Sequence, residues 1–210
     1  MLPSHKYATG PLTPGVAKVA GKFLDVGRQR GTGFAGQWKR ALPCAPPPLK
    51  DVETLVRTRP LLVEVQALVN KTSYGYPKRA ASGIDLNRVN LLVAMLERRT
   101  KLSLSEQDIY LNIVGGIRLQ DPAADLAICL AIGSAAKGLQ LKQNAVVFGE
   151  VGLSGEVRHV PFIEKRVAEA KKLGFEVAIG PKDRSARAPK NTLLHSVPDV
   201  RTALNEFLQK

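Results

Sequence analysis

Residues 121–132 read Asp-Pro-Ala-Ala-Asp-Leu-Ala-Ile-Cys-Leu-Ala-Ile, and the apolar, alanine-rich character continues to about residue 137. A run that is apolar on nearly every face predicts a helix buried on most sides. Pro122 precedes the run at a position where a missing N–H costs little. Asp121 is predicted to cap the helix rather than to form a carboxylate pair with Asp125. The segments on either side show the patterns of strands and further helices.

Strand patterns lie before and after this helix. Residues 61–69 alternate apolar and polar side chains in their second half, and residues 108–114 alternate throughout, so both predict strands with one wet face. Gly115-Gly116 is predicted to end the second strand through a close backbone approach. The remaining strand predictions are residues 74–83, interrupted by turns, residues 145–151 and 155–160 around a turn, and residues 176–179.

Three further helices are predicted from apolar side chains at helical spacing. The first begins after Asp85 as N-cap, and its apolar face comprises Leu86, Val89, Leu92, Val93 and Leu96. The others span about residues 161–173, stopped by Gly174, and about residues 199–209. Strands and helices mix without strict alternation, which predicts an α+β fold of mixed α/β layers.

Residues 1–50 differ from the rest of the chain. They hold eight Lys and Arg residues and a single acid, Asp25, and they are rich in Gly and Pro. This composition predicts a disordered basic extension, apart from a short candidate helix near residues 16–26. A flexible basic tail, an organellar transit peptide and the remnant of a truncated or mis-called reading frame all remain open.

Composition limits the classes of partner and site. The net charge of +13, from 31 Lys+Arg against 18 Asp+Glu, favours polyanionic partners such as nucleic acid. The two cysteines, Cys44 and Cys129, form no Cys/His cluster, so neither a zinc site nor a disulfide framework is expected and a reducing compartment fits. No apolar run approaches the roughly 20 residues that span a bilayer, so no membrane partner is expected.

Five stretches together resemble, in order and spacing, the C-terminal Lon-protease-like domain of the RadA (Sms) family of bacterial DNA-repair proteins. The resemblance covers about residues 57–210, and it implies a fold like the Lon proteolytic domain and ribosomal protein S5 domain 2. The stretches are residues 59–69, residues 83–88, Asn112-Ile113-Val114-Gly115-Gly116, residues 121–127 and residues 148–158.

The resemblance also implies that the protease chemistry is lost. Lon uses a Ser-Lys dyad, whose serine position maps to Ala124 and whose lysine position maps to Glu164, with Lys165 one residue away. No catalytic residue is therefore assigned. The alternative interpretation of Gly115-Gly116 is that it is a remnant of the protease cleft. The zinc motif and P-loop of the family are absent from this sequence. ATP, magnesium and zinc are thus expected only in full-length relatives, and no cofactor or metal is expected here.

The function implied is that of a non-catalytic domain that helps a homo-oligomeric, hexameric ring to assemble and contacts single-stranded or branched DNA. The family implies the bacterial cytoplasm, or an organelle if residues 1–50 are a transit peptide. The nearby rings are Tyr74, Tyr76 and Tyr110, which form no stacking ladder, so sequence-independent phosphate contact is expected. The alternatives are a residual Lon-type serine peptidase and a protein-interaction scaffold without DNA binding. The candidate DNA-binding residues are Lys78, Arg79, Arg88, Arg98, Arg99, Arg158, Lys165 and Arg166.

Overall fold

The computed structural model describes residues 16–23, 60–73, 75–141, 144–182 and 193–209. The chain divides into two units, one of residues 1–22 and 60–210 and the other of residues 23–59. Apart from the last residue of the first strand, every element described below belongs to the first unit. No helix among the described residues is both long and apolar enough to cross a membrane.

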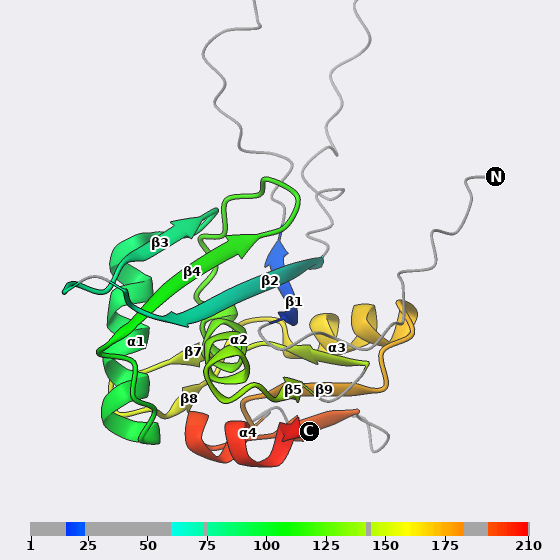
Figure 1. The fold of residues 1–210 in the computed structure, drawn as a ribbon. Helices are drawn as coiled ribbons and strands as arrows, with labels where there is room; N and C mark the ends of the chain where they lie inside the picture. Colours follow the sequence, from blue (N-terminus) through cyan, green and yellow to red (C-terminus); the bar gives the residue numbers. More distant parts are fainter. Residues whose placement is uncertain (1–15, 24–59, 74, 142–143, 183–192, 210) are drawn as a thin grey trace, which may run out of the picture. The chain divides into compact units, whose positions relative to one another are not determined.

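The first unit is organised on a mixed sheet with the strand order β10-β9-β6-β1-β2-β4-β3 (Figure 1). The pairs β10/β9, β9/β6, β6/β1 and β3/β4 are parallel, whereas β2/β4 is antiparallel. Short antiparallel pairs join β5 (Gln140–Leu141) to β11 (Leu208–Gln209) and β7 (Glu150–Val151) to β8 (Val157–Arg158). The strands of the large sheet are β1 (Val16–Phe23), β2 (Pro60–Lys71), β3 (Arg79–Ser82), β4 (Gln107–Ile113), β6 (Ala145–Val147), β9 (Val177–Gly180) and β10 (Leu194–Ser196).

The alanine-rich run forms the central helix of the fold, as predicted. A 3-10 turn, η2 (Pro122–Ala124), leads into α2 (Asp125–Lys137), whose first ten residues are all buried. It packs against β2 on one side and against α1 (Leu86–Thr100) and α4 (Val200–Phe207) on others. A Cβ at Gly133 would lie 2.3 Å from Cδ2 of Leu204, so the absence of a side chain there lets α4 approach closely.

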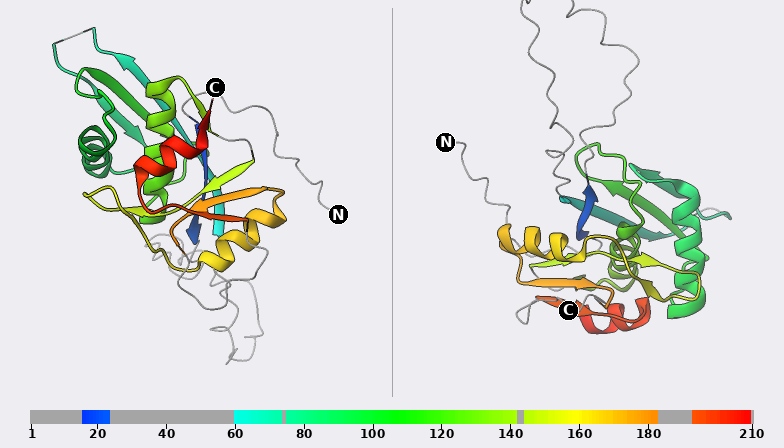
Figure 2. Two further views of the ribbon diagram at one scale, coloured as in Figure 1. Left: turned by 90° about the horizontal axis from the view of Figure 1, so that it is seen from below. Right: turned by 180° about the vertical axis from the view of Figure 1, so that it is seen from behind.

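A second apolar cluster lies on the opposite face of β6 and β9, under α3 (Ile163–Lys172). Val146 and Ala178 belong to this cluster, whereas Val147 and Ile179 belong to the main core. Figure 2 (left) shows β9 and β10 between α3 and α4. Because both of their faces are covered, β6 and β9 are continuously apolar and buried rather than alternating.

The other half of the sheet is covered on one face. In β2 and β4 the residues Val65 and Leu111 are buried, whereas Leu68 and Tyr110, which pair across the two strands, are exposed. This confirms the one wet face that the alternation predicted.

Two sequence expectations are wrong. The candidate helix near residues 16–26 is instead the strand β1, in which Val19 pairs with Val147 of β6. Residues 1–50 are therefore not wholly a disordered extension, and residues 1–15 and 24–59 lie outside the described part of the chain. Gly115 and Gly116 make no close approach, because an added Cβ would meet no atom nearer than 3.8 Å. They are needed instead for positive φ angles of 91° and 66° in the turn after β4.

Candidate functional site

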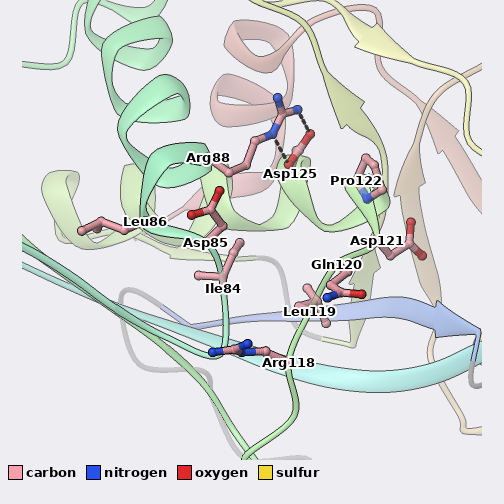
Figure 3. A pocket seen from close by; sticks show the side chains of 10 residues that line it. All are labelled: Ile84, Asp85, Leu86, Arg88, Arg118, Leu119, Gln120, Asp121, Pro122 and Asp125. Carbon is pink, nitrogen blue, oxygen red and sulfur yellow. Dashed lines mark hydrogen bonds and ion pairs between the residues drawn. The ribbon is translucent and has the colours of Figure 1, made fainter. Parts of the chain in front are cut away.

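A cavity of about 550 Å³ opens between the start of α1, the segment before η2 and the start of α2 (Figure 3). Two capping aspartates position the helix starts that border the cavity. The Asn87 N–H donates to the side chain of Asp85 at the start of α1, and the Ala123 N–H donates to that of Asp121 at 3.0 Å at the start of η2. The predicted cap of Asp85 is thereby confirmed, whereas Asp121 caps the 3-10 turn that leads into α2 and not α2 itself, whose N-cap is Ala124. The lining residues are Ile84, Asp85, Leu86, Arg88, Arg118, Leu119, Gln120, Asp121, Pro122 and Asp125.

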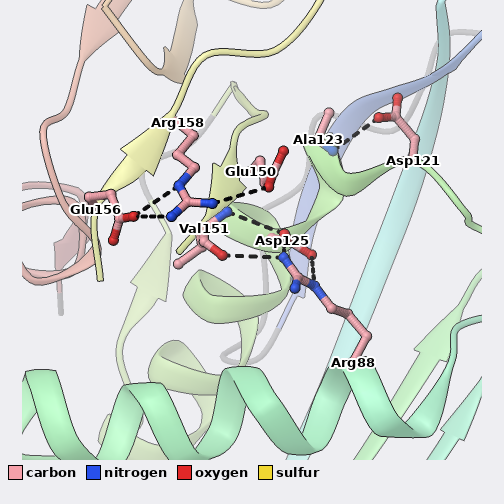
Figure 4. Close-up of polar contacts among 8 residues, drawn as sticks. All are labelled: Arg88, Asp121, Ala123, Asp125, Glu150, Val151, Glu156 and Arg158. Atoms are coloured by element: carbon pink, nitrogen blue, oxygen red, sulfur yellow. Dashed lines mark hydrogen bonds and ion pairs between the residues drawn. The ribbon is translucent and has the colours of Figure 1, made fainter. Parts of the chain in front are cut away.

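An ion pair between Arg88 and Asp125 forms one wall of the cavity (Figure 4). The Nε of Arg88 donates to Oδ1 of Asp125 at 3.0 Å, and Nη2 donates to Oδ2 and to the carbonyl of Val151. The Val151 N–H in turn donates to Oδ2 of Asp125 at 3.2 Å. The side chain of Asp125 is 3% exposed and that of Arg88 is 33% exposed. The network thus ties α1 and β7 to the start of α2.

Burial and ion pairing shift the pKa of the Asp125 carboxyl group in opposite directions. Burial raises the pKa of Asp125 above its ordinary value, while the hydrogen bonds from Arg88 and Val151 oppose that shift. The hydrogen bond with Asp125 is the main reason that the pKa of Arg88 is raised. Burial has the larger effect on the pKa of Asp125, because its side chain is almost completely withdrawn from water.

Asp121 is held by another arginine, Arg166, which is buried. The Nη2 of Arg166 donates to Oδ2 of Asp121 at 2.8 Å, and its Nε donates to the carbonyl of Pro161 at 3.1 Å. The side chain of Arg166 is 1% exposed. This pair therefore fixes α3 against η2, and Arg166 is not presented to a ligand from the surface.

The two positions that the resemblance to Lon assigned to the Ser-Lys dyad, Ala124 and Glu164, carry neither Ser nor Lys. Ala124 is 1% exposed. Glu164 and Lys165 are exposed on the first turn of α3. The cavity lining contains no Ser, Thr, Cys or Lys. Burial raises the pKa of the Cys129 thiol well above its ordinary value and keeps it neutral. The polar side chains of the cavity lining are Asp85, Arg88, Arg118, Gln120, Asp121 and Asp125, which suit ion pairing and hydrogen bonding.

A separate ion pair joins the turn after β7 to β8. Arg158 donates from Nε and Nη2 to Oε1 of Glu156 at 2.9 and 2.6 Å, and its Nη1 lies 3.8 Å from Glu150 (Figure 4). The Ser154 hydroxyl donates to Oε2 of Glu156 at 2.6 Å. The pKa of Glu156 is lowered to about 2. The hydrogen bond from Ser154 is the largest cause, and the hydrogen bond from Arg158 is the next largest among those from side chains.

The predicted DNA-binding residues do not form one group. Arg166 is wrong as a surface contact, because it is buried against Asp121. Arg88 and Arg158 are each engaged by carboxylates, which reduces their attraction for phosphate. The remaining members lie on different elements: Lys78 and Arg79 at β3, Arg98 and Arg99 in the last turn of α1, and Lys165 on α3.

Arg98 and Arg99 gain a neighbour that the sequence analysis missed. Arg201, on the first turn of α4, donates from Nε to the carbonyl of Arg99 at 2.9 Å. With Lys101, which ends α1, these residues form an exposed group that we call the α1-end cluster: Arg98, Arg99, Lys101 and Arg201. A hollow of about 250 Å³ beside it is lined by Arg99, Ser154, Gly155, Asp199 and Arg201. No local signal could have found Arg201, because it lies 102 residues from Arg99 in the sequence.

The described residues contain no group of three or more His, Cys, Asp or Glu side chains placed to hold a metal ion.

Residues 76–184, just over half of the chain, match the family described as subunit ChlI of Mg-chelatase.

Curated relatives match a longer stretch. The chain is 53% identical over 153 residues to the DNA repair protein RadA of Bacillus subtilis (72% of this chain, 33% of that protein). It is 42% identical over 159 residues to that of Listeria monocytogenes (75% and 35%), and 43% identical over 151 residues to that of Escherichia coli K12 (71% and 33%). The chain thus spans about a third of the length of these relatives. It belongs to the ChlI family of domains and, over that shared third, to the RadA family of DNA repair proteins.

Proposed function

We propose that this domain is a non-catalytic part of a RadA-type repair protein, with a Lon-like fold, that contacts DNA phosphates without reading sequence. The observation that carries the proposal is the α1-end cluster, in which four exposed cations gather where α1 and α4 meet. Arg98, Arg99 and Lys101 lie at the C-terminal end of α1, where the helix dipole favours cations. The net charge of +13 and the relatives' name as DNA repair proteins agree with a polyanionic partner.

Within the α1-end cluster, Arg99 is the strongest candidate for a phosphate contact. Its backbone carbonyl accepts from Arg201, so the end of α1 is tied down while the Arg99 side chain lines the adjacent hollow. Asp199 also lines the hollow, but its carboxylate accepts from the N–H and hydroxyl of Thr202. Glu97, the nearest acid on α1, accepts from Ser105. Both neighbouring acids are therefore already engaged.

The test is fluorescence anisotropy of labelled DNA titrated with the whole chain at several salt concentrations. The variant Arg98→Gln/Arg99→Gln should weaken binding and reduce the slope of log affinity against log salt by about 0.7–0.9 for each phosphate that is no longer neutralised. The matched control is Lys171→Gln/Lys172→Gln, which removes the same charge from the exposed end of α3 and should change little. Equal effects of the two variants would show that only net charge matters. No effect of either would assign binding elsewhere, for example to residues 1–50.

Two further parts of the proposal rest on resemblance to the RadA family. One is assembly into a hexameric ring, for which sedimentation equilibrium of the whole chain is the test. The other is the absence of peptidase activity, supported by the buried Ala124 at the expected serine position. A fluorogenic peptide assay should give no hydrolysis above the rate without protein, and a specific hydrolysis abolished by substitution of Ser154 or Ser134 would refute it.

A further inference from the structure

Phe162 is an unusual residue at the point where the segment after β8 enters α3. Its side chain is 51% exposed, and its backbone adopts the left-handed conformation with φ 62° and ψ 37°. It occupies the N-cap position of α3 but makes no side-chain capping hydrogen bond. A bulky non-glycine residue is rarely found in this conformation, because the Cβ crowds the backbone.

Neither the backbone conformation nor helix capping favours phenylalanine at this position. Glycine or asparagine adopts the left-handed conformation more easily, and serine or aspartate would supply the missing cap. Burial is not the reason either, since half of the side chain faces water, in contrast to Ile163, which is 4% exposed beside it. An exposed aromatic side chain kept in an unfavourable backbone conformation is instead typical of a residue retained for a contact with a ligand.

A cation accompanies the ring. The Nζ of Lys165 lies 5.0 Å from the centroid of the Phe162 ring, within the range of a cation–π interaction. His159 and Pro161, just before the ring, are also exposed, and Glu164 is the exposed acid of this turn. An aromatic face beside a lysine is the combination with which proteins hold a base and its neighbouring phosphate in single-stranded nucleic acid.

We propose that Phe162 stacks on an unpaired nucleobase while Lys165 contacts the adjacent phosphate, so that the domain prefers single-stranded to double-stranded DNA. This deepens the DNA contact proposed above and rests on it. Stacking tolerates every base, because each has a π-face, so it preserves sequence independence. In a duplex the bases are already stacked and paired, and the ring has no base to accept.

The experiment compares the whole chain with Phe162→Leu and Phe162→Tyr. Leucine keeps the apolar character and the same backbone difficulty but lacks the π-face, whereas tyrosine keeps the ring. The probes are a labelled strand of about 20 thymidines, longer than the ~4–16-nucleotide sites of single-strand-binding folds, and a duplex of the same length. Phe162→Leu should weaken binding to the single strand about tenfold, leave the duplex within about twofold, and leave the unfolding midpoint unchanged; Phe162→Tyr should bind like the parent chain.

A strand with abasic positions makes the test specific for stacking. It keeps the phosphates and removes the bases, so the parent chain should lose affinity for it while Phe162→Leu should bind it as well as the intact strand. Equal binding of both strands by the parent chain would overturn the stacking proposal. If Arg98→Gln/Arg99→Gln still weakens DNA binding while Phe162→Leu does not, the stacking inference fails and the phosphate contact stands. If the parent chain binds no DNA, both are refuted.

Discussion

Replacing Arg88 by methionine tests whether the ion pair at the cavity holds the start of α2 in place. The change removes the guanidinium but leaves Asp125, whose side chain is 3% exposed, as a buried carboxylate. Removing one partner of a buried pair typically costs about 3–5 kcal/mol. We expect about 3 kcal/mol at neutral pH, at the lower end of that range, because the Arg88 side chain is one-third exposed and the Val151 N–H still donates to Asp125.

The pH dependence distinguishes a charge effect from a packing effect. The folded-state pKa of Asp125 is raised by burial, so its contribution to stability is fully present below the unfolded pKa and is lost as pH rises through the folded pKa. Without Arg88 the folded pKa rises further, so this loss becomes larger and extends to higher pH. Between the two pKa values the variant should lose up to about 1.4 kcal/mol per pH unit.

The assay is urea unfolding of both proteins at about pH 4, near the ordinary pKa of an aspartate, and at about pH 7. The destabilisation by Arg88→Met should be clearly smaller at the lower pH. Asp125→Asn is the control, because it removes the titrating group and should cost less, about 1–2 kcal/mol, since Arg88 retains access to water. The same loss of stability at both pH values would refute the view that the charge of Asp125 is the cause.

Three further predictions concern the scaffold of the site. Carboxyl-carbon NMR should give Glu156 a pKa of about 2, and Ser154→Ala should raise it, because that hydroxyl is the main cause of the shift; an unchanged value would contradict the assignment. Gly83→Ala should lower stability more than Gly116→Ala in thermal unfolding, since both have positive φ but only the Cβ at position 83 would clash, with a backbone oxygen at 2.6 Å. The positive φ by itself costs about 1 kcal/mol with alanine at either position. Equal losses of stability would therefore show that the atoms around Gly83 move to accommodate the added Cβ. Deleting residues 1–23 should abolish cooperative unfolding, because β1 lies between β6 and β2 in the sheet; a fully cooperative deletion variant would show that the sheet closes without it.

The place of β1 in the sheet also limits which variants are suitable for measuring DNA binding. A chain that begins at residue 51 would be free of the basic residues of the N-terminal segment, but it would also lack β1. Weaker binding by such a chain would then report unfolding as readily as the removal of basic side chains. Substitutions in the whole chain avoid this ambiguity.

Much of the scaffold follows from local pattern. The apolar run after Pro122 is a buried helix because no face of it is polar enough to meet water, and Asp85 and Asp121 cap their elements because a short acidic side chain reaches the free N–H groups. The alternation in residues 61–69 and 108–114 also specified the wet face of β2 and β4, since side chains of a strand point to opposite faces.

Contacts between distant segments decided the rest. Arg166 has the local appearance of a surface residue in a basic helix, yet its pairing with Asp121, 45 residues away, buries it. Residues 16–23 carry only a weak local preference, and the edge of β6 makes them a strand. The meeting of Arg99 with Arg201 and the backbone conformation of Phe162 likewise depend on how α1, α3 and α4 pack within the fold. A sequence specifies the period of each segment by itself, whereas the partner of a charged or aromatic side chain is fixed only when the segments pack.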